Sequence, residues 1–227
     1  LSWQQAIQTR RAEIPLDGAT RARVHVRHGG GQLHVRGEKF EGALVSGVCG
    51  GGLLSRITRS GDLIDARLSV PGRQGFMSLR FPWAWGPSNS LDWTLGVTDR
   101  VPVALTIETA GGTSTLDLTS LLLTELDLKT SASTMAITFP AQAGLTIARI
   151  EASAASLVIR VPLGVAARIR AVKAIGSADI DSGRFLEIDS GREYRSADYE
   201  SSEYRVDLSI DVSLGSVEIL WCRQAPD

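Results

Sequence analysis

The sequence is poor in several features that mark common protein classes, beginning with cysteine. Its two cysteines, Cys49 and Cys222, lie far apart and form no CxxC pair, so neither a disulfide framework nor a zinc knuckle is indicated. The formal net charge is only −1, and no block of like charges occurs. Proteins that bind nucleic acid through phosphate contacts need a basic surface, so we expect no nucleic-acid partner.

Long apolar runs and prolines are scarce as well. No stretch approaches the roughly 18 apolar residues of a membrane span, and no signal peptide is visible. Because the chain begins with Leu1 rather than Met, we expect any membrane attachment to come from a segment outside it. The 23 glycines against 8 prolines indicate tight turns between short apolar runs, which disfavours a helical bundle.

Alternating apolar residues are abundant. They recur at every second position over short runs, for example at Val24 and Val26 and at Leu126 and Leu128, which is the period of a β-strand. No long stretch keeps the spacing of an amphipathic helix. We therefore predict an all-β fold, with residues 1–227 forming one domain.

A unit of strand, small-residue corner and strand repeats along the chain. In each copy a second apolar anchor follows the first by nine residues, and the first anchors are spaced by 21, 22 and 21 residues. This repeat predicts a single-stranded, right-handed β-solenoid whose rungs stack in parallel, with a β-sandwich as the alternative. The anchor pairs are Ile107 and Leu116, Leu128 and Ile137, Ile150 and Ile159, Ala171 and Ile180, with Val24 and Leu33 and Ile210 and Ile219 at the same spacing.

The position after each first anchor defines a column of outward side chains. It reads Glu108, Lys129, Glu151 and Val172, so stacked rungs would place charges of alternating sign beside one another. We interpret this column as a solvated charge ladder. Charge also differs along the chain: residues 1–100 contain 13 Lys and Arg against 8 Asp and Glu, and residues 101–227 contain 11 against 17.

Residues 12–220 contain a set of strand and corner segments: Ala12–Ala19, Gly29–Val35, Trp93–Ile107, Leu116–Leu121, Leu126–Leu128, Ile137–Pro140, Tyr199–Tyr204 and Gly215–Ile219. Together these segments resemble the toast-rack domain of LiaF-like and putative adhesin-like bacterial cell-envelope proteins. The resemblance implies a β-solenoid attached to a membrane segment, acting in envelope-stress regulation or surface interaction, with a protein or envelope component as its partner. It implies no catalytic residues and no cofactor.

The predicted domain has four regions. Residues 12–100 form N-terminal rungs with a Trp-rich loop, and residues 101–183 form the regular repeats. Residues 184–205 interrupt the repeat as a loop insertion, and residues 206–220 form a closing rung. Because the ends of a solenoid leave strand edges unpaired, homo-oligomerisation is a further prediction.

Candidate contact residues are aromatic. Trp83 and Trp85 lie in a proline-bounded loop that could bind a partner, and Tyr194, Tyr199 and Tyr204 lie in the charged insertion. A metal site is a separate hypothesis. It rests on His25 and His34, two outward histidines on neighbouring strands.

Catalytic motifs are lacking, since neither a GxSxG elbow nor HExxH occurs. Together with what the toast-rack resemblance implies, this lack leads us to expect a non-enzymatic interaction or sensory module of a bacterial envelope-associated protein. The alternative is a carbohydrate-binding or carbohydrate-active β-helix that uses the Trp83 and Trp85 loop, with hydrolysis only if Asp62, Asp65 and Asp92 converge.

Overall fold

The computed structural model describes residues 9–71 and 91–222, and these residues form strands and connecting loops without a helix. The prediction of an all-β fold is confirmed for this part of the chain. The strands are β1 (Arg10–Pro15), β2 (Arg21–His28), β3 (Gln32–Glu38), β4 (Ala43–Cys49), β5 (Leu54–Ser60), β6 (Leu63–Ser69), β7 (Trp93–Thr98), β8 (Val103–Thr109), β9 (Gly112–Asp117), β10 (Leu123–Ser131), β11 (Ser133–Thr138), β12 (Leu145–Ser153), β13 (Ala155–Pro162), β14 (Ala166–Ile180), β15 (Phe185–Asp189), β16 (Glu193–Ser196) and β17 (Arg205–Cys222).

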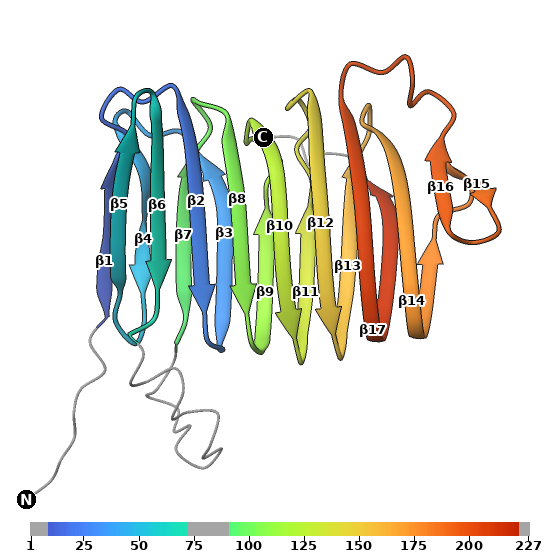
Figure 1. Cartoon of the computed structure of the whole chain (residues 1–227), viewed down its shortest axis with the longest axis horizontal. Coiled ribbons are helices and arrows are strands. Elements are labelled where there is room, and N and C mark those ends of the chain that lie inside the picture. The colour runs from blue at the N-terminus through green and yellow to red at the C-terminus, as the bar shows by residue number, and fades with distance from the viewer. Residues whose placement is uncertain (1–8, 72–90, 223–227) are drawn as a thin grey trace, which may run out of the picture.

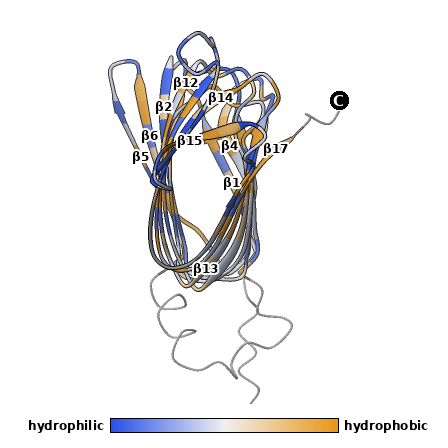
Figure 2. Cartoon of the chain, turned by 90° about the vertical axis from the view of Figure 1, so that its right-hand side faces the viewer, coloured by the Kyte–Doolittle hydropathy of each residue, from blue (hydrophilic) through white to orange (hydrophobic). Residues whose placement is uncertain are grey.

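The strands form two arms that face each other across the core. The first arm runs in the order β5, β6, β2, β8, β10, β12, β17, β14, β16, β15, and the second in the order β1, β4, β7, β3, β9, β11, β13, β17, β14. The long strands β14 and β17 pass through both arms, so all the described strands belong to one mixed sheet. Figure 1 shows the rungs side by side, and Figure 2 shows the arms meeting at a closed side and separating at an open side.

Strand alternation fills the space between the arms. In β8, Val103, Leu105 and Ile107 are buried while the residues between them are partly exposed, and β12 alternates in the same way. Rungs in the middle pair in parallel, which places like residues above one another and buries each inward row on the next. Antiparallel pairs occur only toward the two ends of the described stack.

The closed side is built from the predicted small-residue corners. Gly112 has a φ of +93°, and a Cβ added there would lie 2.0 Å from the carbonyl oxygen of Gly31 in the neighbouring corner. Ala132 and Ala154 adopt positive φ at the equivalent corners, which small residues tolerate best. The corners predicted around 214–216 and 175–177 instead lie inside β17 and β14, which bend through the closed side without interruption.

The order of the rungs in space differs from their order in the sequence. Ile107 lies beside Leu128, and Leu128 beside Ile150, as the repeat predicts. Ile150 then lies beside Ile210 of β17, and Ala171 of β14 lies beyond Ile210. The prediction that the fourth repeat stacks directly on the third is therefore wrong. Every rung carries the same anchor spacing, so the repeat fits any order, and the pairing of β17 with both neighbours decides it.

The first rungs are also out of sequence order. The rung made by β2 and β3 lies between the rung of β6 and β7 and the rung of β8 and β9. At both ends of the stack, the rung nearest the end in space is therefore not the one nearest that end of the sequence.

Residues 184–205 form more than the predicted loop insertion. They contain the antiparallel hairpin of β15 and β16, and β16 pairs with β14 at the edge of the first arm. Phe185 is 1% exposed and fixes the hairpin to the core. The sequence predicts a loop because the segment is rich in charged residues and interrupts the repeat, yet its Phe185 and Tyr199 are both buried.

Candidate functional site

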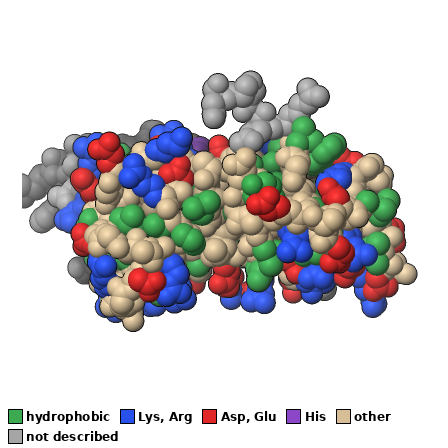
Figure 3. All heavy atoms as spheres, turned by 90° about the horizontal axis from the view of Figure 1, so that it is seen from above, with side chains coloured by type: hydrophobic (Ala, Val, Ile, Leu, Met, Phe, Trp, Pro, Cys, Tyr) green, Lys and Arg blue, Asp and Glu red, His purple; other side chains and the backbone are tan. Residues whose placement is uncertain are grey.

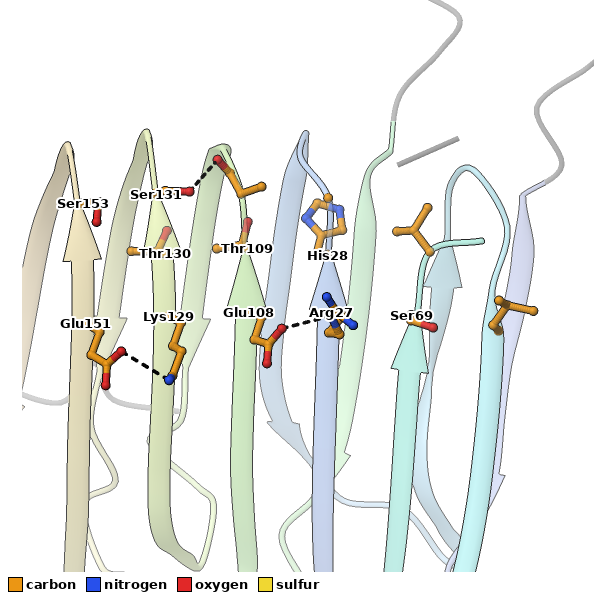
Figure 4. A pocket seen from close by; sticks show the side chains of 14 residues that line it. Arg27, His28, Ser69, Glu108, Thr109, Lys129, Thr130, Ser131, Glu151 and Ser153 are labelled. Atoms are coloured by element: carbon orange, nitrogen blue, oxygen red, sulfur yellow. Dashed lines mark hydrogen bonds and ion pairs between the residues drawn. The ribbon is translucent and has the colours of Figure 1, made fainter. Parts of the chain in front are cut away.

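A shallow groove lies on the outer face of the first arm beside the closed side (Figure 4). We call it the ladder groove, because charged and hydroxyl side chains from successive rungs line it in rows. Its volume is about 740 Å³. The lining residues are Arg27, His28, Gly29, Leu54, Ser69, Val70, Glu108, Thr109, Ala110, Lys129, Thr130, Ser131, Glu151 and Ser153.

Two ion pairs form the charged row of the groove. Arg27 Nε lies 2.9 Å from Glu108 Oε2, and Lys129 Nζ lies 3.3 Å from Glu151 Oε2. The strand register places these four residues next to one another on β2, β8, β10 and β12, with Asp211 of β17 beside Glu151. The predicted adjacency of Glu108, Lys129 and Glu151 is therefore confirmed.

The prediction that Val24 and Leu33 occupy the anchor columns is wrong, because the structure pairs Val26 with Ile107 and Val35 with Leu116. Arg27, the residue after Val26, therefore joins the charged row, which the sequence did not predict. The spacing of nine residues fits both choices. The alignment on Val26 and Val35 places Arg27 opposite Glu108, and this favourable charge pair is the sequence signal that supports it.

Threonine and serine side chains lie next to the charged row, and their hydrogen bonds stabilise the groove. The Oγ atoms of Thr130 and Ser133 are 2.5 Å apart in a buried hydrogen bond, and Ser131 Oγ donates to the carbonyl oxygen of Ala110 at 3.2 Å. The second bond joins successive corners. Side chains in the groove therefore rest on a backbone that is tied from rung to rung.

His28 lies at the inner end of the groove and is only 3% exposed. Its Nε2 is 2.6 Å from the carbonyl oxygen of Leu91, and its ring is tilted against that of Trp93 with centroids 5.5 Å apart. Burial lowers the pKa of His28, while the Leu91 carbonyl and the nearby Asp92 carboxylate oppose that shift. A neutral imidazole that donates from Nε2 satisfies this geometry.

The two thiols are unsuited to nucleophilic chemistry. Cys49 is fully buried, and burial raises the pKa of its thiol to about 12. Cys222 is partly buried, and burial again raises the pKa of the thiol. Both stay protonated near neutral pH, and a thiol is a much weaker nucleophile than a thiolate.

The predicted histidine pair is not brought together. His25 lies on β2 in the first arm and His34 on β3 in the second, and both side chains alternate with buried residues, so they project from opposite outer faces. His25 Nε2 lies 3.7 Å from Asp65 Oδ2 instead. Within residues 9–71 and 91–222, no group of three or more His, Cys, Asp or Glu side chains could hold a metal ion.

The predicted tyrosines contribute mainly to packing. Tyr199 is 5% exposed and lies against the guanidinium groups of Arg168 and Arg205, at 5.2 and 5.8 Å from the ring centroid. Tyr194 and Tyr204 are partly buried against the core. A contact role does not fit the ring of Tyr199, and for the other two it stays a prediction.

Beside Tyr199, both Arg168 and Arg170 bind the carboxylate of Asp207, the latter at 2.6 Å from Nη2 to Oδ1. These hydrogen bonds, acting against the effect of burial, leave the pKa of Asp207 below its usual value. No local sequence pattern predicts this cluster, because its members come from β14 and β17, which are distant in the chain.

The residues of the carbohydrate alternative are separated. Asp62 accepts hydrogen bonds from Thr20 and Arg21 at the open side, whereas Asp92 accepts one from the backbone of Gln32 at the closed side. Asp65 lies between them on β6, so no pair of these carboxylates shares a cleft. Trp83 and Trp85 lie outside the described residues.

On the open side of the molecule, Figure 3 shows hydrophobic side chains in separate small groups among charged and polar ones. None of the described residues forms a helix long and apolar enough to cross a membrane.

Of the two solved structures compared with the chain, the first shares its fold. The chain is similar to a "putative cell adhesion protein" from Clostridium sporogenes, with a TM-score of 0.84, 15% identity, and coverage of 95% of this chain and 100% of that one. A second similarity is to a "putative adhesin" from Bacteroides fragilis, with a TM-score of 0.29, 9% identity, and coverage of 96% and 98%. No curated protein matches the chain.

The family comparison covers most of the sequence. The model Toast_rack_N, described as the N-terminal domain of toast_rack, DUF2154, matches residues 3–160. This match spans more than half of the chain and includes the rungs from β1 to β12 and most of β13. The protein therefore belongs to the toast_rack N-terminal domain family.

Proposed function

We propose that this chain is a non-enzymatic interaction module of a bacterial envelope-associated protein, and that the ladder groove contacts its partner. The observation that carries the proposal is the row of fixed charges from Arg27 to Glu151 on an exposed sheet face. Alternating charges at strand spacing can pair with a partner whose charges have the complementary order. Such complementarity contributes more to the specificity of binding than to its affinity. A folded protein or a charged envelope polymer fits such a face.

The structural neighbour supports a surface role. Its printed description is a "putative cell adhesion protein", and it shares the fold over 95% of this chain. We accordingly propose association with the cell surface, with any membrane attachment supplied by a segment outside the chain. A narrower role in envelope-stress sensing stays a prediction of the family resemblance.

Three observations favour binding over catalysis. The thiols are held protonated by burial, and Asp62, Asp65 and Asp92 do not meet. Hydrolysis by a carboxylate pair needs two carboxyl groups about 5–10 Å apart that flank the scissile bond. The groove itself is open to solvent, whereas catalytic sites gain from excluding water.

The test is binding of the fluorescently labelled chain to intact bacterial cells, with an ion-pair swap, K129E/E151K, as the variant. The swap keeps an attractive pair but reverses the order of charges, so we expect cell binding to weaken at least about tenfold, or about 1.4 kcal/mol. The matched control, R36E/E38R, swaps the pair of exposed Arg36 and half-buried Glu38 on the second arm and should leave binding intact.

Two results would overturn the proposal. Equal binding by both swapped variants would remove the ladder groove from the contact. New reducing ends released from soluble cell-wall polysaccharide by the purified chain would show that the module is an enzyme.

A further inference from the structure

Both ends of the first arm present strand edges without a described neighbour. β5 pairs only with β6, and β15 pairs only with β16. Figure 1 places them at opposite ends of the stack. Unpaired edges template further strand pairing unless they are blocked.

The two edge strands expose aliphatic side chains. Every residue of β5 is exposed, with Leu54 at 54% and Ile57 at 46%. On β15, Leu186 and Ile188 are 54% and 51% exposed. Large aliphatic side chains on an open edge favour coverage by another strand.

Charge distinguishes one end from the other. β5 carries Arg56 and Arg59 and no acidic residue, whereas β15 carries Glu187 and Asp189 and no basic residue. Two β5 edges would therefore repel each other, as would two β15 edges, while β5 and β15 attract.

Register and direction also match. β15 runs parallel to β14 and β6, and β5 runs antiparallel to β6, so copies stacked in one orientation would bring β15 antiparallel to β5. Arg56 pairs with a residue on β6, that residue pairs with one on the next strand, and so on across the first arm. This series of paired residues ends at Asp189 on β15. Pairing of β15 with β5 at this register would set Arg56 opposite Asp189, the residue that follows the register shift in the β15–β16 ladder.

The two end strands of the second arm also carry opposite charges. Its terminal strand β1 exposes Arg11, and the second half of β14 exposes Asp179 at the other end. The strand register again connects the level of Arg11 to that of Asp179. The basic end and the acidic end of the molecule therefore complement each other on both arms.

We propose that copies of this chain associate head to tail, with β15 of one copy pairing antiparallel to β5 of the next. The first arm then continues from copy to copy as one sheet. Such a contact is heterologous, so it leaves a free β5 and a free β15 at the ends and builds linear oligomers. An adhesive surface module would gain a longer row of ladder grooves from this assembly.

The experiment is sedimentation velocity of the full chain from micromolar to near-millimolar concentration, at low and high salt. We expect wild type to form dimers and longer species as concentration rises, with association weaker at high salt. R56E and D189R should each lower the association constant at least about tenfold. An equimolar mixture of R56E and D189R should associate again, because each variant then finds its opposite charge.

R149E is the matched control, because Arg149 is exposed at the same level on β12 in the middle of the stack and should leave association unchanged. Circular dichroism of each variant checks the fold. The proposal is overturned if wild type remains monomeric throughout, if R56E and D189R associate like wild type, or if their mixture stays monomeric.

Discussion

At the scale of single residues, the corner glycines carry strict requirements. Gly112 combines positive φ with a neighbouring carbonyl that a Cβ would approach to 2.0 Å. We expect Gly112→Ala to lower the free energy of unfolding by roughly 1–3 kcal/mol for the backbone strain, with the clash adding to that cost. Chemical denaturation measures the change.

Gly42→Ala is the control for that prediction. Nothing lies within 4 Å of a Cβ added at Gly42, and its φ is outside the left-handed region. A change within about 1 kcal/mol is expected there. Equal losses in both variants would contradict the special role of the corner.

His28 should make the stability of the fold depend on pH. Burial holds its pKa below the unfolded value of about 6.5, so the unfolded chain binds the proton more readily. Stability from the neutral imidazole is complete above pH 6.5 and falls as the pH drops below that value. Denaturation at pH 8 and pH 5 should show a smaller loss for His28→Gln than for wild type, and an equal loss would refute the assignment.

At the scale of elements, β17 holds the far end of the stack together because it pairs with β12, β13 and β14. Leu208 in the first half of β17 is fully buried, and Leu208→Ala should lower the free energy of unfolding by about 2–5 kcal/mol through lost contacts and a cavity. Leu214 on the same strand is 52% exposed, so Leu214→Ala should stay within about 0.5 kcal/mol. Urea denaturation of both variants tests the contrast, which similar midpoints would refute.

At the scale of the whole molecule, protection from hydrogen exchange should follow position in the stack. Amides of β8, β10 and β12 are paired on both sides within a packed core, whereas β5 and β15 are edges. In dilute solution we expect the central strands to exchange slowest and the two edge strands fastest. Mass spectrometry of the exchanged chain would show the gradient, and uniform protection would contradict it.

The elements could be predicted from the sequence to different degrees. The strands of β8 to β13, their corners and the neighbouring charges Glu108, Lys129 and Glu151 follow from local alternation and spacing. The hairpin of β15 and β16 was not predicted, because the apolar residues of β15 do not alternate regularly with polar ones and β16 is mostly polar, so neither strand has the period of two that marks a half-buried strand. Arg27 was missed by a shift of two residues, which keeps the inward and outward faces the same.

The sequence by itself determined the strand period, the small corners and the balance of charge, because each depends on residues close together in the chain. Only the tertiary structure decided that β2 and β17 occupy inner positions among the rungs, since equal anchors allow any order. It also turned the basic first part and acidic second part of the sequence into two ends with Arg56 and Asp189 at one level. That alignment depends on register summed across many strands, which no local pattern records.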